Sequence, residues 1–455
     1  MEIINEQKLN GLISAAKAPS RQRLFELLAK AELKKGLELG EVAELLNVTD
    51  PKMLEQMFAS SRKVKEDIYG NRLVFFAPIY LSSFCVNDCA YCGFHCSNKG
   101  AERKKLTRAE VEQQVRELIK MGHKRLLVEV GEDPERNTID YVVDSIRTIY
   151  ATKEGKGEIR RVNVNIAATS VDDYKKLKKA GIGTYQLFQE TYHRPTYKRL
   201  HEGPKADYDR QITAHERAFK AGIDDLGIGV LFGLYDYKFE VLALVSHAQY
   251  MDRTLGVGPH TISVPRFCPA DTVNLELPNQ VADADFLKVI SVLRLAVPYT
   301  GMIISTRETP EMRAKAFEIG ITQASAASAT SPGGYGQGKN AGAQFEVHDS
   351  RSVEEILASV IERGYLPSFC TACYRSNRTG DRFMELAKAG SIHYLCKPNA
   401  ILTFKEFLVD YASPKLKVIG ENLIVKEVGE VDEERRPELM RRLRRIEKGE
   451  RDLFF

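Results

Sequence analysis

The sequence predicts an α/β protein whose main part is a (βα)8 TIM-type barrel, with a helical extension before it and a mostly helical unit after it. Two observations lead to this fold class. From residue 73 onward, short apolar runs alternate with amphipathic stretches of helical length, the pattern of a parallel sheet. Eight such runs precede residue 326, and eight strand–helix repeats are the number that closes a barrel.

The expected strands are short apolar runs separated by helical stretches. They span Leu73–Tyr80, Arg125–Val130, Arg161–Ala167, Thr184–Gln189, Asp225–Gly233, His260–Pro265, Met302–Thr306 and Ile321–Ser325. The first helix of the barrel should begin at the capping box Thr107-x-x-Glu110, and a later one at Thr309-Pro310. Glycines are expected where helices end, at Gly122, Gly181, Gly222 and Gly320.

Helices are expected on both sides of the barrel, which itself should span residues 73–345. Residues 1–72 show no strand pattern, and the expected helices there are Arg21–Lys35, Leu39–Leu46 and Pro51–Asp67. A glycine-rich stretch, Pro332–Gly342, precedes the C-terminal unit of residues 346–455.

Three helices are expected in the C-terminal unit. They are Val353–Arg363, Thr403–Tyr411 with a capping box Thr403-x-x-Glu406, and a basic helix over Pro437–Lys448. The last carries one apolar face and should pack against the body of the protein; that face is formed by Leu439, Met440, Leu443 and Ile446.

The composition excludes several classes of function. Hydrophobic residues make up 43% of the 455 residues and charged residues 28%, as in soluble globular proteins. The net charge of +4 is spread along the chain, so no nucleic-acid partner is expected. No run is long enough for a membrane helix, and the N-terminus lacks the features of a secretory signal. We therefore expect a soluble, cytoplasmic protein that binds no membrane.

Seven of the eight cysteines fall into two groups far apart in the sequence. In a large chain without an export signal, such grouping indicates metal binding rather than disulfides. The first group, Cys85-x-x-x-Cys89-x-x-Cys92, directly follows the first strand. Three thiolates leave one iron of a cubane cluster without a protein ligand. The alternative is a closed zinc site completed by Cys96 or His95.

This spacing, with Tyr91 just before the last cysteine, resembles the signature of the radical SAM superfamily. The resemblance implies a 4Fe-4S cluster whose open iron binds S-adenosyl-L-methionine (SAM). One electron then splits SAM into methionine and a 5′-deoxyadenosyl radical. The resemblance also gives Tyr91 a contact with the adenine.

Polar residues follow several expected strands, at the end where barrel active sites lie. By the same resemblance, Gly131 and Glu132 meet the amino group of SAM, while Asn165 and Glu190 contact its nucleoside or amino-acid part. The alternative for each residue is a structural role, because charged strand ends are common.

Three further segments resemble the tyrosine and tryptophan lyases of this superfamily: Gln189–His193, Ser305–Glu308 and Pro332–Tyr335. The resemblance implies that Arg307 holds the substrate carboxylate, for which its guanidinium is suited, with Ser325 as a neighbour. The alternative is a salt bridge from Arg307 to Glu308 or Glu311 at the barrel rim.

The second cysteine group, Cys370-x-x-Cys373 followed by Cys396, resembles the C-terminal domain of the tyrosine lyases that mature iron-only hydrogenase. The resemblance implies a C-terminal iron–sulfur domain with a second 4Fe-4S cluster that can hold an extra iron atom. A histidine helps to hold that iron in these lyases, and His260, at the start of a strand, is the candidate. The alternatives are a zinc site completed by His393 and a structural role for His260.

The function implied by the resemblance has two stages. L-tyrosine is cleaved at its Cα–Cβ bond to p-cresol and dehydroglycine, and dehydroglycine then becomes carbon monoxide and cyanide on iron for the hydrogenase H-cluster. The implied partners are a one-electron reductant of the flavodoxin or ferredoxin type and other hydrogenase maturation proteins. One alternative is the tyrosine lyase of thiamine synthesis (2-iminoacetate synthase), and another is a non-enzymatic iron–sulfur scaffold. Cys96 and Cys268 belong to neither triad and are expected to be small buried residues.

Overall fold

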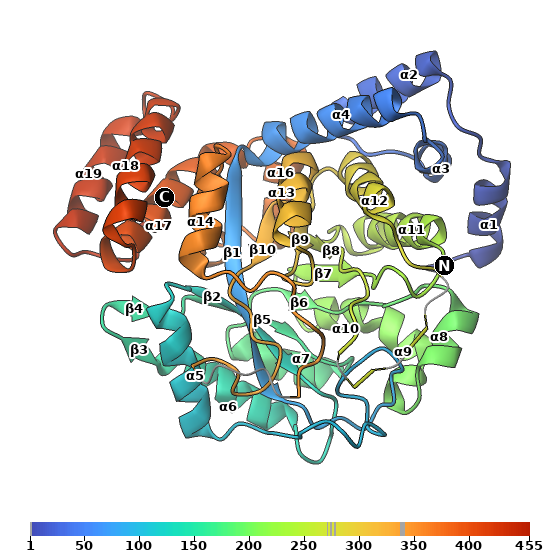
Figure 1. Cartoon of the computed structure of the whole chain (residues 1–455), viewed down its shortest axis with the longest axis horizontal. Coiled ribbons are helices and arrows are strands. Elements are labelled where there is room, and N and C mark those ends of the chain that lie inside the picture. The colour runs from blue at the N-terminus through green and yellow to red at the C-terminus, as the bar shows by residue number, and fades with distance from the viewer. Residues whose placement is uncertain (1, 271, 274, 277–278, 337–341) are drawn as a thin grey trace.

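The computed structural model describes residues 2–270, 272–273, 275–276, 279–336 and 342–455, so residues 337–341 of the glycine-rich stretch lie outside the described part. Its centre is a closed parallel barrel, which confirms the predicted fold class (Figure 1). The eight strands are β1 (Arg72–Ser82), β2 (Arg125–Val130), β5 (Arg161–Asn165), β6 (Tyr185–Gln186), β7 (Leu226–Gly229), β8 (Thr261–Ser263), β9 (Gly301–Ile304) and β10 (Gln323–Ser325).

Each strand pairs in parallel with the next, and β10 returns to β1 through the register Val74↔Gln323 to Phe76↔Ser325. All eight predicted strands are present, and most are shorter than expected because their ends continue into loops at the mouth of the barrel.

Helices between the strands form the outer layer of the barrel (Figure 1). They are α5 (Arg108–Lys120), α6 (Ile139–Ala151), α7 (Val171–Lys179), α8 (Arg194–Leu200), α9 (Tyr208–Ile212), α10 (Ala214–Lys220), α11 (Tyr237–Leu255), α12 (Asp283–Ala296) and α13 (Pro310–Ile319), with a short 3-10 helix at Pro204–Ala206. The capping box at Thr107 is formed as predicted. A two-stranded hairpin, β3 (Lys153–Glu154) with β4 (Gly157–Glu158), was not anticipated.

The N-terminal helices lie against the barrel's outer layer. They are α1 (Glu6–Ala15), which was not predicted, α2 (Arg21–Glu32), α3 (Leu39–Leu46) and α4 (Pro51–Tyr69). The longest of them, α4, packs on α12 and α13. At its start, the Asp50 side chain accepts hydrogen bonds from the backbone N–H groups of Lys52 and Met53.

The C-terminal unit joins the barrel through a strand that the sequence did not reveal. The strand β11 (Leu366–Ser368) pairs with the first residues of β1, from Arg72↔Leu366 to Val74↔Ser368. That edge of β1 is available because β2 pairs only from Ala77 onward. The pairing places the residues after Ser368 beneath the N-terminal mouth of the barrel. The helices of this unit are α14 (Val353–Glu362), α15 (Ala372–Arg375), α16 (Gly380–Lys388), α17 (His393–Asp410), α18 (Pro414–Gly429) and α19 (Arg436–Glu447).

The predicted helix start at Thr403 is wrong, because α17 begins ten residues earlier, at His393. Thr403 donates its hydroxyl hydrogen bond to the Asn399 carbonyl within the helix, at 3.1 Å. The carboxylate of Glu406 is fully buried and pairs with Lys124 at 3.2 Å and with Arg160 at 2.9 Å, both on the barrel. The capping pattern therefore misled, since its acidic residue forms a tertiary ion pair.

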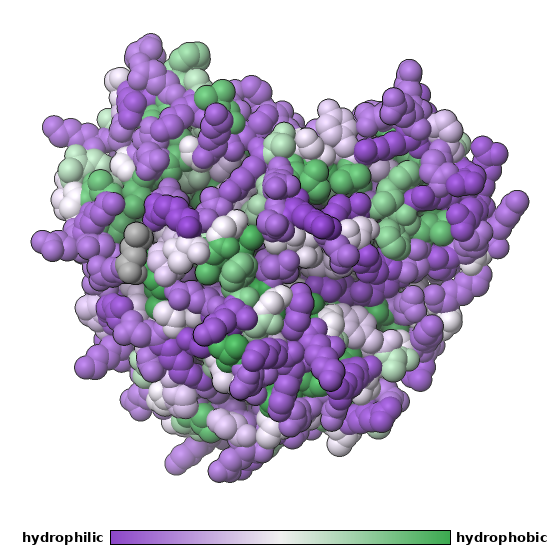
Figure 2. Space-filling model, turned by 180° about the vertical axis from the view of Figure 1, so that it is seen from behind, coloured by the Kyte–Doolittle hydropathy of each residue, from purple (hydrophilic) through white to green (hydrophobic). Residues whose placement is uncertain are grey.

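The last helix, α19, packs against the body as predicted, with Leu439, Leu443 and Ile446 buried, although Met440 is exposed. On the face shown in Figure 2, apolar side chains are scattered among hydrophilic ones. Within the described ranges, none of the helices is both long and apolar enough to cross a membrane.

Candidate functional site

The first cysteine triad lies on the loop that leaves β1 at the C-terminal mouth of the barrel. Cys85, Cys89 and Cys92 line one cavity there. The loop is fixed by backbone hydrogen bonds from Val86 to Glu132 and from Ala90 to Leu200. Burial raises the pKa of all three thiols, that of Cys92 to about 11, and each neighbouring thiol adds to the rise at Cys89. Binding of iron would release these protons.

The geometry argues against a closed zinc site in this loop. Four ligands at about 2.3 Å from one zinc ion would hold their sulfurs about 3.8 Å apart. Among the described residues, neither cysteine triad has all three of its sulfur atoms within 4.8 Å of one another. Cys96 is exposed, which corrects the prediction that it is buried, and His95 Nδ1 lies 2.6 Å from an Asp88 carboxylate oxygen. This wider spacing of the sulfur atoms suits an iron–sulfur cluster, which is larger than a single zinc ion, better.

The residues predicted to contact SAM surround the same cavity. Tyr91, Gly131, Glu132, Asn165 and Glu190 all line it together with the three cysteines. A side chain at Gly131 would place its Cβ 2.3 Å from the Phe84 carbonyl oxygen. Only glycine therefore allows the end of β2 to approach the cysteine loop so closely.

Ion pairs hold the acidic residues of this cavity in place. Glu132 accepts hydrogen bonds from Arg210 at 2.6 Å and from Asn87 at 2.7 Å. Glu190 has a left-handed backbone conformation (φ 68°) and pairs with Lys205 at 2.8 Å. Burial by itself lowers the pKa of Lys205, but the charges of Glu190, Cys89 and Tyr197, together with the hydrogen bond to Glu190, outweigh it, so that the net shift is upward.

Tyr91 is held by a histidine that the sequence analysis missed. His201 Nδ1 donates to the Tyr197 carbonyl at 2.7 Å, so its Nε2 accepts the Tyr91 hydroxyl hydrogen bond at 2.7 Å. Burial lowers the pKa of His201 to about 4, which keeps the ring neutral. Neither Lys205 nor His201 carries a motif: His201 directly follows α8 and Lys205 lies in the 3-10 helix Pro204–Ala206, both between β6 and β7 and away from the strand ends.

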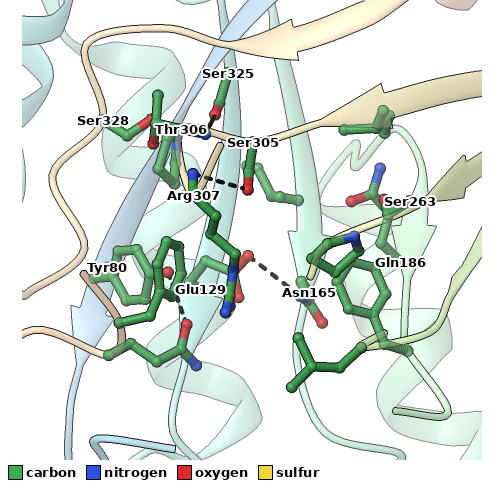
Figure 3. Close-up of a pocket in the computed structure, with 18 of the residues that line it drawn as sticks. Tyr80, Glu129, Asn165, Gln186, Ser263, Ser305, Thr306, Arg307, Ser325 and Ser328 are labelled. Atoms are coloured by element: carbon green, nitrogen blue, oxygen red, sulfur yellow. Dashed lines mark hydrogen bonds between the residues drawn. The ribbon is translucent and has the colours of Figure 1, made fainter. Parts of the chain in front are cut away.

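A second cavity, here called the interior cavity, extends from this mouth into the barrel (Figure 3). Arg307, Ser325 and Ser328 line it from one side, while Asn165, Gln186 and Ser263 line it from the other. The Ser325 hydroxyl accepts a hydrogen bond from the Thr306 backbone at 3.2 Å. Figure 3 shows the Arg307 side chain extending into this cavity toward Glu129.

The charge of Arg307 is left free for a ligand. Glu308, one of the two partners considered from the sequence, instead pairs with Arg266. No ion pair of Arg307 occurs within the part of the chain that the structure describes, so the rim salt bridge is not formed. Its guanidinium lies 3.4 Å from the centroid of the Phe345 ring.

Glu129, which the sequence analysis also missed, lies beside this cation in the cavity. It accepts a hydrogen bond from Asn165 Nδ2 at 3.2 Å. Burial raises the pKa of Glu129 to about 8, although Asn165 and Arg307 both act to lower it. The side chain is therefore mostly neutral at pH 7. Its position inside strand β2 could have been noticed, because an acidic residue interrupts an otherwise apolar run.

The second cysteine triad lies at the opposite mouth of the barrel. Cys370, Cys373 and Cys396 line one cavity together with His260, which immediately precedes β8. Burial lowers the pKa of His260, so its ring is neutral, the form that binds metals. His393, the alternative fourth ligand, does not line this cavity. Two buried arginines that were not predicted also line it: Arg72 and Arg125, the first residues of β1 and β2.

The interior cavity that contains Arg307 (the upper cavity) and the cavity of the second triad (the lower cavity) are lined by the same strands. On β1, Val74 lines the lower cavity and Phe76 the upper one; on β9 the corresponding pair is Gly301 and Ile303. Phe76 and Ile303 pack with Leu127 into a small apolar cluster at the floor of the upper cavity. On both strands the residues that line the two cavities are therefore only two positions apart.

The chain resembles known proteins over its whole length. Residues 79–245 match the Radical SAM superfamily, and residues 263–366 match the Biotin and Thiamin Synthesis associated domain. The chain is 30% identical over 329 residues to 2-iminoacetate synthase of Escherichia coli (strain K12), covering 72% of this chain and 85% of that enzyme.

Two solved structures are similar throughout. One is a crystal structure of HydG, a maturase of the FeFe-hydrogenase, with 56% identity, a TM-score of 0.97 and full coverage of both chains. The other is the FeFe-hydrogenase maturase HydG from Carboxydothermus hydrogenoformans, with 38% identity, a TM-score of 0.85 and 97% coverage of both chains.

Proposed function

Because the chain belongs to the radical SAM superfamily, in the group of tyrosine lyases that includes the hydrogenase maturase HydG, we propose that its two cysteine triads serve two successive stages of one reaction. The first stage cleaves L-tyrosine to p-cresol and dehydroglycine. The second stage yields carbon monoxide and cyanide on iron for hydrogenase assembly. The observation that carries this division is the placement of the triads at opposite mouths of one barrel.

At the upper mouth, Cys85, Cys89 and Cys92 would hold the first 4Fe-4S cluster. When bound, this cluster and SAM supply the 5′-deoxyadenosyl radical that takes a hydrogen atom from the tyrosine amino group. Glu132 and Asn165 are placed to orient the polar groups of SAM, and the Tyr91 ring, fixed by His201, is placed to contact the adenine. The buried wall around them excludes water from the reactive groups.

Tyrosine binds in the interior cavity. Arg307, which has no ion pair among the described residues, offers its guanidinium to the substrate carboxylate, for which two parallel hydrogen bonds are the favoured arrangement. Neutral Glu129 beside it does not repel that carboxylate. Ser325 and Ser305 add hydroxyl groups to the same wall. This assignment of Arg307 rests on a side chain that extends into the cavity and has no ion pair in the described part of the chain.

At the lower mouth, Cys370, Cys373 and Cys396 would hold the second 4Fe-4S cluster, which supplies the iron for the diatomic products. His260 is placed in the same cavity, buried and neutral, to hold an extra iron atom. Arg72 and Arg125 add positive charge that attracts the anionic dehydroglycine. Because the residues that line the two cavities are two positions apart on β1 and on β9, the small fragment has a short path down the barrel.

The first stage is tested by anaerobic reconstitution with iron, sulfide, SAM, tyrosine and a strong reductant. Chromatography should detect 5′-deoxyadenosine and p-cresol in step with each other. A non-enzymatic iron–sulfur scaffold would bind clusters and leave SAM intact, which would contradict the proposal.

The second stage is tested with Cys370→Ser and Cys396→Ser, using carbon monoxide trapping by a haem protein. Both variants should still form p-cresol and lose carbon monoxide. His260→Gln should keep the second cluster and lose the extra iron. An enzyme of the 2-iminoacetate synthase type would form p-cresol without carbon monoxide even as the wild type. Equal loss of p-cresol in the cysteine variants would contradict two separate stages.

A further inference from the structure

A third group of metal-ligating side chains lies outside both cysteine triads. Cys268 follows β8 near the upper mouth. Glu346 and His348 come just after Phe345, which lines the interior cavity. One ligand atom of each residue falls within 4.8 Å of the other two. The Cys268 sulfur lies 3.6 Å from His348 Nε2, which in turn lies 3.7 Å from a Glu346 carboxylate oxygen. Cys268 is buried, as predicted.

These separations fit one small divalent ion. A tetrahedral zinc ion with a sulfur at about 2.3 Å and a nitrogen at about 2.0 Å holds those two atoms about 3.5 Å apart, close to the separation of Cys268 Sγ and His348 Nε2. Nitrogen and carboxylate oxygen at about 2.0 Å each would be about 3.3 Å apart, which a small rotation of the exposed Glu346 side chain provides. One thiolate, one imidazole and one carboxylate form a donor set of mixed softness, suited to zinc or ferrous iron.

The backbone around the group is already fixed. The N–H of His348 donates to the Thr306 carbonyl at 2.9 Å, and that of Glu346 donates to the Pro269 carbonyl at 3.2 Å. The Cys268 thiol donates to the Glu346 carbonyl at 3.4 Å. The residues after β8 and β9 therefore hold the three ligands close together, so that little ordering of the chain is needed for an ion to bind.

The three side chains of the group differ in their exposure to solvent. Cys268 is 4% exposed, whereas the side chains of His348 and Glu346 are 42% and 57% exposed. The thiol thus forms the base of the group, and the other two ligands open toward solvent. An ion could enter from outside and would keep a fourth position for water, as open zinc sites do.

We propose that Cys268, Glu346 and His348 bind one divalent ion, zinc or ferrous iron, at a site separate from both iron–sulfur clusters. On binding, the Cys268 thiol loses its proton to solvent and the thiolate becomes a ligand. The ion ties the end of β8 to the segment that carries Phe345, whose ring covers Arg307. The bound ion therefore stabilises the position of Phe345, which lines the interior cavity where tyrosine is proposed to bind.

The test uses the reconstituted holoenzyme, with both clusters verified by iron and sulfide analysis, loaded with one equivalent of zinc and desalted. Elemental analysis should find one zinc retained for each chain. X-ray absorption at the zinc edge should show one sulfur at about 2.3 Å and the remaining ligands as nitrogen or oxygen near 2.0 Å. Cys268→Ser should remove the sulfur shell, and His348→Gln, an exposed position that will not disturb folding, should release the zinc.

Cys96→Ser is the matched control, because Cys96 is an exposed cysteine outside both triads, and it should retain zinc as the wild type does. A parallel loading with ⁵⁷Fe(II), after assembly of the clusters with natural-abundance iron, distinguishes the two metals. Mössbauer spectra should then show a ferrous signal that His348→Gln removes and His260→Gln leaves. Retention of neither metal, a shell without sulfur, or undiminished binding in both variants would overturn the proposal.

Discussion

The Arg307 guanidinium lies 3.4 Å from the centroid of the Phe345 ring and faces the interior cavity without an ion pair among the described residues. An aromatic face steadies a cation without occupying its hydrogen-bond donors in the way a carboxylate would. The burial of this side chain lowers the pKa of Arg307, yet a guanidinium stays charged at neutral pH. The arrangement leaves a fixed positive charge available to an incoming carboxylate.

Arg307→Lys should therefore weaken tyrosine binding much more than SAM binding. Lysine keeps the charge but loses the paired hydrogen bonds, a loss of about 2 kcal/mol, or about 30-fold in KM for tyrosine. Steady-state p-cresol formation gives KM, and 5′-deoxyadenosine formed without tyrosine reports on the SAM site. An unchanged KM would show that another group binds the carboxylate.

Glu129→Gln should remove a pH dependence of tyrosine binding. Because burial raises the pKa of Glu129 to about 8, the wild-type side chain is neutral below that pH and becomes a carboxylate above it. The carboxylate then competes with the substrate for Arg307, so KM should rise between pH 7 and pH 9. Glutamine keeps the shape without the charge. The ionisation of tyrosine itself affects both proteins equally, so the difference between their KM profiles isolates Glu129.

Gly301→Val should uncouple the two stages. The Cβ of any residue here would lie 2.5 Å from Gln323 Nε2, and Gly301 lies where the lower cavity meets the barrel interior. We expect p-cresol formation to persist, carbon monoxide to fall, and glyoxylate from hydrolysed dehydroglycine to rise. Gly11→Ala is the control and should change none of the three products, because a Cβ at Gly11 would meet no described heavy atom within 4 Å beyond its own stretch of helix. If carbon monoxide stayed at the wild-type level, the fragment would be taking another route.

Glu406→Gln should destabilise the junction between the barrel and the C-terminal unit. Removing one partner of a buried ion pair costs about 3–5 kcal/mol, since Lys124 and Arg160 would remain buried with less compensation. Urea unfolding followed by circular dichroism measures this, as the chain has no tryptophan for fluorescence. Glu385→Gln, on the exposed side of α16, should have little effect on the unfolding free energy.

The pattern of strands and the two cysteine triads could be read from the sequence because both depend on local spacing. Strand–helix alternation specifies a parallel barrel whatever the distant contacts are, and three cysteines within eight residues share one loop in any fold. The acidic partner in the pattern Thr403-x-x-Glu406 misled for the opposite reason: a local motif was overridden by a buried ion pair with the barrel.

Only the tertiary structure decided how these parts meet. The pairing of β11 with the free edge of β1 sets the second triad under the barrel, and that pairing joins residues almost 300 positions apart. Lys205 reaches Glu190 and His201 reaches Tyr91 from segments with no signature of their own. Cys268 meets His348 across 80 residues. Contacts of this kind arise from closure of the chain into a barrel, so no window of sequence contains them, whereas the ligand spacing and strand periodicity lie within single segments.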